Sequence, residues 1–144
     1  MKTLLQIYIL FLFLIFSGCN VSPQPIDYGN ESCHFCRMTI VDKQHGAEIV
    51  TNKGKAYKFD SSECMINFLK GFDASTVKLY LSNDYSEPIA LIDATKATFL
   101  ISDQIPSPMG ANLSAFKNSV EAKKMQNEKG GNLYSWEELL THFK

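Results

Sequence analysis

A short run of sulfur and nitrogen donors, Cys33-His34-Phe35-Cys36-Arg37-Met38, is the part of the sequence best suited to chemistry. It places two thiols, one imidazole and one thioether within six residues. Sulfur donors are soft ligands, and among biological first-row metals they favour Cu(I). In an extended segment Cys36 and Met38 would point to the same side, because side chains alternate along a strand. The spacing therefore predicts that both sulfurs face one ion.

Other interpretations of these cysteines remain open at this point. Cys33 and Cys36 also form a CxxC pair of the kind used in redox or structural roles, with Met38 as an ordinary core residue. A zinc-stabilised module would use Cys33, Cys36, Cys64 and a histidine. Cys64 lies on a helical apolar stripe, which predicts mainly a small buried hydrophobe and only secondarily a third sulfur donor. Apart from Cys19 the cysteines are odd in number, so at least one thiol should stay free or bind a ligand.

Composition excludes several classes of function. The chain has 144 residues and a formal net charge of -1, whereas a nucleic-acid-binding surface is strongly basic. Arg37 is the only arginine, so there is no guanidinium cluster for phosphate recognition. The sequence contains no evident Ser/His/Asp set, catalytic carboxylate pair or phosphate-binding loop. We therefore expect a protein that is not an enzyme and that has no nucleic-acid partner.

The N-terminus resembles the export signal of a bacterial lipoprotein. Lys2 precedes an apolar run over residues 4–16, which is too short for a comfortable membrane span but has the length of a signal-peptide core. Ser17-Gly18-Cys19 then resembles a lipobox, in which the cysteine receives a lipid and becomes the mature N-terminus. More than one acyl chain at Cys19 would hold the protein stably on a membrane.

This signal predicts three segments and a location. Residues 1–18 form the signal peptide, residues 19–32 a lipid-anchored polar linker, and residues 33–144 the copper-binding domain. The mature protein is then an extracytoplasmic, membrane-anchored lipoprotein on the periplasmic side of the inner or outer membrane.

Hydrophobic periodicity and turn residues predict an α+β domain. We expect the strands over residues 89–92 and 96–102 to pair as a hairpin across Asp93-Ala94-Thr95. The other expected strands are residues 47–51, 55–59, 77–81 and 111–116, and the expected helices are residues 63–70, 118–129 and 136–143.

A weak internal repeat supports this fold class. His45-Gly46-Ala47, a strand, Phe59 and a capped helix are matched by Met109-Gly110-Ala111, a strand, Phe116 and a second capped helix. The repeat predicts two weakly repeated ββα-type units with a shared antiparallel sheet covered by helices. Under this alignment His45 and Met109 occupy equivalent loop positions before a strand.

These motifs together resemble the NosL family of lipoproteins, which are copper chaperones for nitrous oxide reductase, the multicopper enzyme that ends denitrification. The resemblance spans essentially the whole chain in the expected order. It rests on the lipobox, Cys36-Arg37-Met38, Tyr57-Lys58-Phe59-Asp60, Pro108-Met109-Gly110, and Ala115-Phe116 followed by Gly130-Gly131.

The resemblance implies a membrane-anchored Cu(I) chaperone that delivers copper to nitrous oxide reductase or to its membrane-associated maturation proteins. Cys36 and Met38 would be Cu(I) ligands, Met109 lies in a matching motif, and Cys33 and His45 are further candidates. The residue between Cys36 and Met38 is often glycine in this family and is Arg37 here. The alternative function is an extracytoplasmic thiol–disulfide oxidoreductase that uses Cys33 and Cys36.

Overall fold

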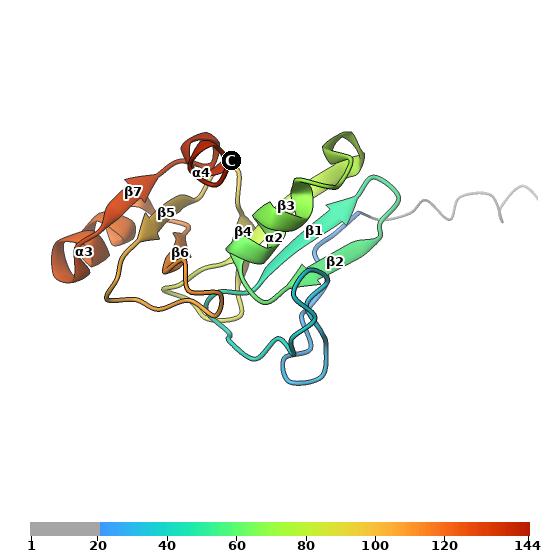
Figure 1. Ribbon diagram of the computed structural model, residues 1–144, viewed down its shortest axis with the longest axis horizontal. Coiled ribbons are helices and arrows are strands. Elements are labelled where there is room, and N and C mark those ends of the chain that lie inside the picture. Colours follow the sequence, from blue (N-terminus) through green and yellow to red (C-terminus); the bar gives the residue numbers. More distant parts are fainter. Residues whose placement is uncertain (1–20) are drawn as a thin grey trace, which may run out of the picture.

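The computed structural model describes residues 21–144 and contains two antiparallel sheets that lie side by side (Figure 1). Helices connect or follow the strands of each sheet. The predicted signal peptide and Cys19 lie outside the described residues. The first unit contains β1 (Ala47–Thr51), β2 (Ala56–Phe59), α2 (Ser62–Leu69), the short 3-10 helix η1 (Ala74–Thr76), β3 (Val77–Asn83) and β4 (Leu91–Asp93). The second unit contains β5 (Thr98–Ile101), β6 (Leu113–Phe116), α3 (Ser119–Lys129), β7 (Asn132–Tyr134) and α4 (Trp136–His142). The predicted α+β class is confirmed.

The internal repeat is visible in the sheet topology. The strand orders are β2-β1-β3-β4 and β6-β5-β7, so in both units the third strand lies on the far side of the first. Phe59 and Phe116 each end the second strand of their unit, opposite Ala47 and Thr98 respectively. Both units therefore follow the same strand–strand–helix–strand path.

Two details of the expected arrangement were wrong. The runs predicted to form one hairpin belong to different sheets, because β4 pairs with β3 while β5 pairs with β6 and β7. The strands accordingly form two sheets instead of a single shared one. The polar turn at Asp93-Ala94-Thr95 is present, with the Thr95 N–H donating to the Asp93 carboxylate at 3.0 Å, but it passes the chain between units.

The proposed equivalence of His45 and Met109 was also wrong. His45 precedes β1, the first strand of its unit, whereas Met109 lies between the first and second strands of the other unit. The topological counterpart of the Met109 loop is the short β1–β2 turn. The alignment failed because short Gly-Ala matches carry no information about which strand follows.

The helices begin where their capping residues predict. Ser61 accepts a hydrogen bond from the Cys64 N–H, and Asn118 accepts one from the Val120 N–H. Ser135 and Glu138 form a capping box at the start of α4. These bonds satisfy backbone donors that the first turn of a helix leaves unpaired. Side-chain oxygens thus set the position of α2, which carries Cys64.

What the units share is a hydrophobic core. Side chains from both sheets, α2 and α4 form one buried cluster, and a smaller cluster lies beneath α3. Full burial of one large apolar side chain contributes about 1.5–3 kcal/mol, so this joint core is enough to hold the units in one body. Members of the large cluster include Ile49, Phe59, Met65, Phe99, Leu113, Trp136 and Leu139.

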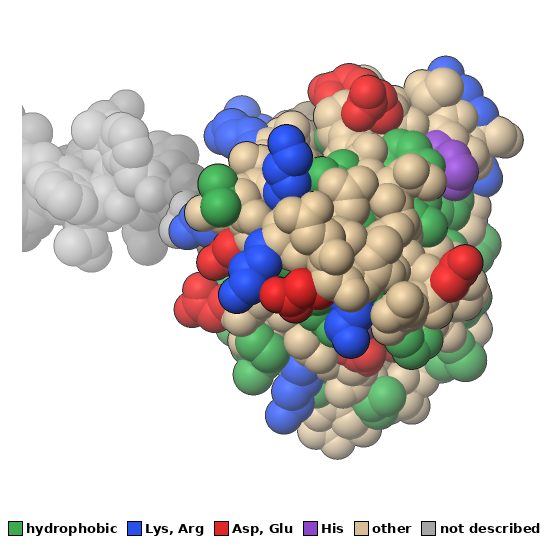
Figure 2. Space-filling view, turned by 90° about the vertical axis from the view of Figure 1, so that its left-hand side faces the viewer, with side chains coloured by type: hydrophobic (Ala, Val, Ile, Leu, Met, Phe, Trp, Pro, Cys, Tyr) green, Lys and Arg blue, Asp and Glu red, His purple; other side chains and the backbone are tan. Residues whose placement is uncertain are grey.

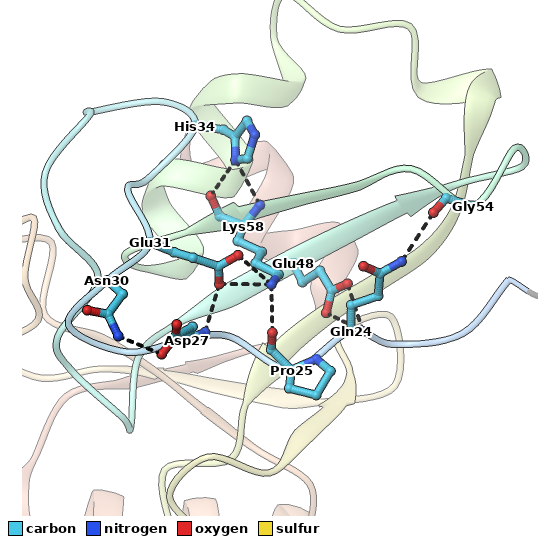
Figure 3. A network of polar contacts seen from close by, with 9 residues as sticks. All are labelled: Gln24, Pro25, Asp27, Asn30, Glu31, His34, Glu48, Gly54 and Lys58. Atoms are coloured by element: carbon cyan, nitrogen blue, oxygen red, sulfur yellow. Dashed lines mark hydrogen bonds and ion pairs between the residues drawn. The ribbon is translucent and has the colours of Figure 1, made fainter.

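Residues 24–31, here called the N-terminal strap, pack against the first sheet instead of acting as a free linker (Figure 3). The Gln24 N–H donates to the Glu48 carboxylate at 3.0 Å, and the Lys58 Nζ donates to the Pro25 carbonyl at 2.6 Å. Lys58 also pairs with Glu31 at 2.7 Å. Ile26 is buried. The folded part therefore starts near Gln24, earlier than the Cys33 boundary expected from composition.

On the face drawn in Figure 2, cationic and anionic side chains are interspersed instead of gathered by sign. Among residues 21–144, no helix has both the length and the apolar content needed to cross a membrane.

Candidate metal centre

Residues 32–39, here called the sulfur loop, form a closed turn before β1. Ser32 and Thr39 pair as an isolated antiparallel bridge. Within it the Cys33 N–H donates to the Met38 carbonyl at 2.8 Å, and the Arg37 N–H donates to the Cys33 carbonyl at 3.1 Å. The extended conformation expected for Cys36 to Met38 was therefore wrong. The chain reverses direction inside the motif, so strand alternation does not orient these side chains.

At this reversal Arg37 adopts a left-handed backbone conformation. Its φ is 68°, in the left-handed region that glycine adopts without strain and that costs other residues roughly 1–2 kcal/mol. A glycine at the position between Cys36 and Met38 would therefore suit the turn better than arginine does. The arginine residue is exposed.

His34 attaches the sulfur loop to β2. The His34 N–H donates to the Lys58 carbonyl at 2.9 Å, and the Lys58 N–H donates back to His34 Nδ1 at 3.1 Å (Figure 3). The ring also lies edge-on to Tyr57, with centroids 5.1 Å apart. His34 thus holds the loop in place, and its Nδ1 is engaged by a backbone donor.

The loop brings three cysteines together. The Sγ atoms of Cys33, Cys36 and Cys64 all lie within 4.8 Å of one another, and all three thiols are free. Cys33 and Cys64 are fully buried, whereas Cys36 is only partly buried. Cys64 comes from the first turn of α2. This arrangement could hold a soft metal ion and leaves one of the three sulfurs partly accessible.

Hydrogen bonds to sulfur favour a negative charge at the centre of the cluster. A hydrogen bond from Cys64 lowers the pKa of the Cys33 thiol and raises that of Cys64, so the pair shares one proton. The Cys36 N–H approaches Cys33 Sγ at 3.5 Å, and the Asp60 and Phe35 amides also face this sulfur. Burial raises the pKa of Cys36. Cys33 is therefore the sulfur best prepared to be a thiolate.

A buried carboxylic acid adjoins this cluster. Burial, with a further contribution from the charge on Cys33, raises the pKa of Asp60 to about 6. Its Oδ1 has no hydrogen-bond partner in the described part of the chain. Asp60 follows β2 directly. The end of this strand therefore places both the amide and the carboxyl group of Asp60 near the Cys33 sulfur.

Met38 and Met109 are surface residues. Their exposed fractions are 47% and 39%, so the interpretation of Met38 as an ordinary core residue was wrong. Met109 belongs to the loop between β5 and β6. In that loop Ser107 Oγ donates to the Glu63 carboxylate and accepts from the Asn112 N–H at 2.9 Å. Since Glu63 adjoins Cys64, the loop that carries Met109 is fastened to the first turn of α2.

His45 is engaged elsewhere. Its Nδ1 lies 3.0 Å from Asp42 Oδ2 and its Nε2 lies 3.2 Å from Ser114 Oγ, and the residue is buried. Both ring nitrogens therefore already have partners, one from each unit. Metal coordination by His45 would require one of these hydrogen bonds to break.

The sequence analysis underestimated the part that Cys64 plays in the candidate site. Its helical spacing predicted a core position, and it is indeed buried in the shared core. The available signal was its location in the first turn of a capped helix that directly follows Tyr57-Lys58-Phe59-Asp60. Nothing in the linear spacing shows that this turn lies against the CxxC motif.

Comparisons with known proteins identify the family of the chain. The NosL family model matches residues 25–143. The copper-binding lipoprotein NosL of Stutzerimonas stutzeri is 27% identical over 130 residues, covering 82% of this chain and 67% of that protein. The crystal structure of the copper chaperone NosL from Shewanella denitrificans superposes with a TM-score of 0.72 at 26% identity, over 83% of this chain and 96% of that one. The chain belongs to the NosL family.

Proposed function

We propose that the protein is a membrane-anchored extracytoplasmic Cu(I) chaperone that supplies copper for the maturation of nitrous oxide reductase. Family membership and the relatives named for copper binding support the metal. The anchor rests on the proposed signal peptide, residues 1–18, and on lipidation of Cys19. The partner rests on the family resemblance alone.

The observation that carries the proposal is the partly exposed thiol of Cys36, two residues before the exposed thioether of Met38. A carrier must hold Cu(I) firmly and still allow ligands of a partner to replace its own. One thiolate neutralises the charge of the ion, while neutral thioethers are the ligands most easily exchanged. Cys36 is therefore the proposed anchor, with Met38 and then Met109 as the weaker donors at the surface.

The alternative, a thiol–disulfide oxidoreductase, fits the site less well. Such an enzyme needs an accessible low-pKa thiol, commonly at the start of a helix. The thiol whose pKa is lowered is Cys33, which is fully buried, while the partly exposed Cys36 has a raised pKa and lies in a turn. The methionines would also have no role in disulfide exchange.

Copper binding is tested by anaerobic titration of the detergent-solubilised full chain against a chromogenic Cu(I) chelator. Cys36→Ser should nearly abolish binding, Met38→Leu should weaken it clearly, and Met109→Leu should weaken it less. Leucine keeps the apolar volume, so thermal unfolding of each variant separates coordination from packing. Wild-type affinity in both Cys36→Ser and Met38→Leu would refute the proposed ligands.

Delivery is tested by mixing the Cu(I)-loaded chain with copper-free nitrous oxide reductase and measuring copper in the separated enzyme. A Cu(I)–chelator complex of matched affinity is the control. Transfer should be faster from the protein than from the chelator, and equal rates would argue against a dedicated carrier. For the anchor, Cys19→Ala should leave the protein unprocessed or release it from the membrane fraction.

A further inference from the structure

The cluster of Cys33, Cys36 and Cys64 contains more thiols than a single exchangeable copper site requires. A carrier that uses Cys36 and surface methionines needs only one thiol, yet two more thiols lie within 4.8 Å of it and away from solvent.

Distances decide what three thiols at this separation can do. A disulfide requires sulfurs about 2.0 Å apart and satisfies only two of them. Metal–sulfur bonds near 2.3 Å, as in zinc sites, place three ligand sulfurs of a trigonal ion about 4 Å apart. The observed upper limit of 4.8 Å therefore requires only a small contraction to hold one ion between all three sulfurs.

The backbone around the buried sulfurs is arranged for metal ligation more than for simple packing. A cysteine that serves as a small hydrophobe needs no hydrogen-bond donors. Cys33 Sγ instead faces the amides of Phe35, Cys36 and Asp60, and Cys36 Sγ faces the amide of Met38. Donors of this kind offset the negative charge that thiolates bring into a buried site.

We propose that Cys33, Cys36 and Cys64 form an inner three-thiolate position for Cu(I), and that Cys36 is shared with the outer position formed by Met38 and Met109. This proposal rests on the proposed copper-carrier function and adds a second resting place for the same ion. Copper stays in the +1 state throughout, and each thiol that becomes a ligand releases its proton to water. The ion leaves by exchanging Cys33 and Cys64 for the thioethers while it remains bound to Cys36.

The two positions differ in accessibility, which gives them different roles. The inner position is closed to solvent by the burial of Cys33 and Cys64, so it keeps Cu(I) from water and oxidants. The outer position lies at the exposed methionines, where ligands of a partner can bind. Inner ligands therefore control retention, and outer ligands control release.

The test uses the full chain in detergent, loaded anaerobically with one equivalent of Cu(I). Copper X-ray absorption should show three equivalent sulfur neighbours in the wild type. Cys33→Ser and Cys64→Ser should each lower affinity at least tenfold, equivalent to about 1.4 kcal/mol, and reduce the sulfur neighbours. Met125→Leu is the matched control, because Met125 packs against the separate cluster beneath α3 and should keep both the wild-type affinity and the three-sulfur signature.

The outcomes separate this inference from the proposed function. Wild-type affinity and sulfur count in both Cys33→Ser and Cys64→Ser would overturn the inner position while leaving the carrier function intact. Absence of Cu(I) binding by the wild type would overturn both. Tightly held zinc that Cu(I) does not displace would assign the cluster to a structural site and also reject the proposal. Cys64→Ala provides a second variant if serine in the core prevents folding.

Discussion

In the first unit α2 buries Cys64, Met65 and Ile66 against its sheet, whereas in the second unit only Ala122 of α3 is buried. The two units nevertheless place their first three strands in the same order, to which the first unit adds β4. Both units contribute to the core, but only the first carries a cysteine of the candidate metal centre, Cys64 on α2. The two units therefore share a topology without sharing the side chains that could bind a metal.

The loops show the same division. A short turn joins β1 to β2, while the β5–β6 connection spans residues 102–112 and carries Met109. The longer loop reaches across to α2 of the other unit through Ser107 and Glu63. The second unit thus contacts the helix that carries Cys64 through a loop, which its strands hold in place.

The largest expected difference between the units concerns the phenylalanines that end their second strands. Phe59→Ala and Phe116→Ala should each lower the free energy of unfolding by about 3–5 kcal/mol, measured by urea denaturation, because both side chains are fully buried. Only Phe59→Ala should also weaken Cu(I) binding in the remaining folded protein, since Asp60 and the sulfur loop lie directly against it. An equal loss of copper affinity in Phe116→Ala would place the centre between the units.

A smaller effect is expected at the glycines that follow the two helices. Gly131 has φ 98°, and a Cβ there would lie 2.1 Å from the Ile101 carbonyl oxygen, so Gly131→Ala should cost at least about 1–3 kcal/mol. Gly71 has open space around its Cβ position, so Gly71→Ala should be neutral or stabilising by up to about 1 kcal/mol. Thermal unfolding of both variants compares them directly, and equal losses would contradict the different packing of these helix ends.

The strands that begin the units differ at one buried position. Glu48 of β1 corresponds to Phe99 of β5 in the pairing registers, and burial raises the pKa of Glu48 to about 7 from 4.5. Since the folded-state pKa is the higher one, stability is greatest below pH 4.5 and falls as pH rises toward 7. Glu48→Gln should weaken this decline in urea midpoints between pH 5 and pH 8. Asp60 titrates in the same range, so part of the decline should remain. An unchanged pH profile in Glu48→Gln would show that Glu48 is ionised without penalty.

The smallest expected effects concern the left-handed residues Arg37 of the sulfur loop and Asn112 of the β5–β6 connection. Their φ values are 68° and 58°. Arg37→Gly should stabilise the protein by up to about 1 kcal/mol, because glycine adopts this conformation without strain. Asn112→Gly should bring no gain, because asparagine tolerates the conformation and its side chain donates to Asp103 at 3.2 Å. Chemical denaturation at fixed pH distinguishes the two, and a larger gain at Asn112 would contradict this reasoning.

Local signals in the sequence were reliable here, and pairing over long distances was not. The helices expected over residues 63–70, 118–129 and 136–143 agree with α2, α3 and α4 to within about one residue at each end, because a capping side chain acts on amides two or three residues away. The destination of β5 was missed because a turn at residues 93–95 is compatible with either a hairpin or a crossover. In the candidate metal centre, the CxxC motif was recognised, whereas metal binding by Met38 and Met109 stays a prediction. The approach of Cys64 depends on how α2 packs, and no spacing in the sequence records that.

The docked N-terminal strap limits how far the copper centre can travel from a membrane. With the lipid proposed at Cys19, an extended chain reaches at most about 17 Å before Gln24 is fixed to Glu48. A free linker extending to Cys33 would have allowed about 45–50 Å. The segment between Cys19 and Gln24 would then be a short tether that keeps the folded domain close to the lipid surface. Such a tether favours copper recipients that are themselves held at that surface.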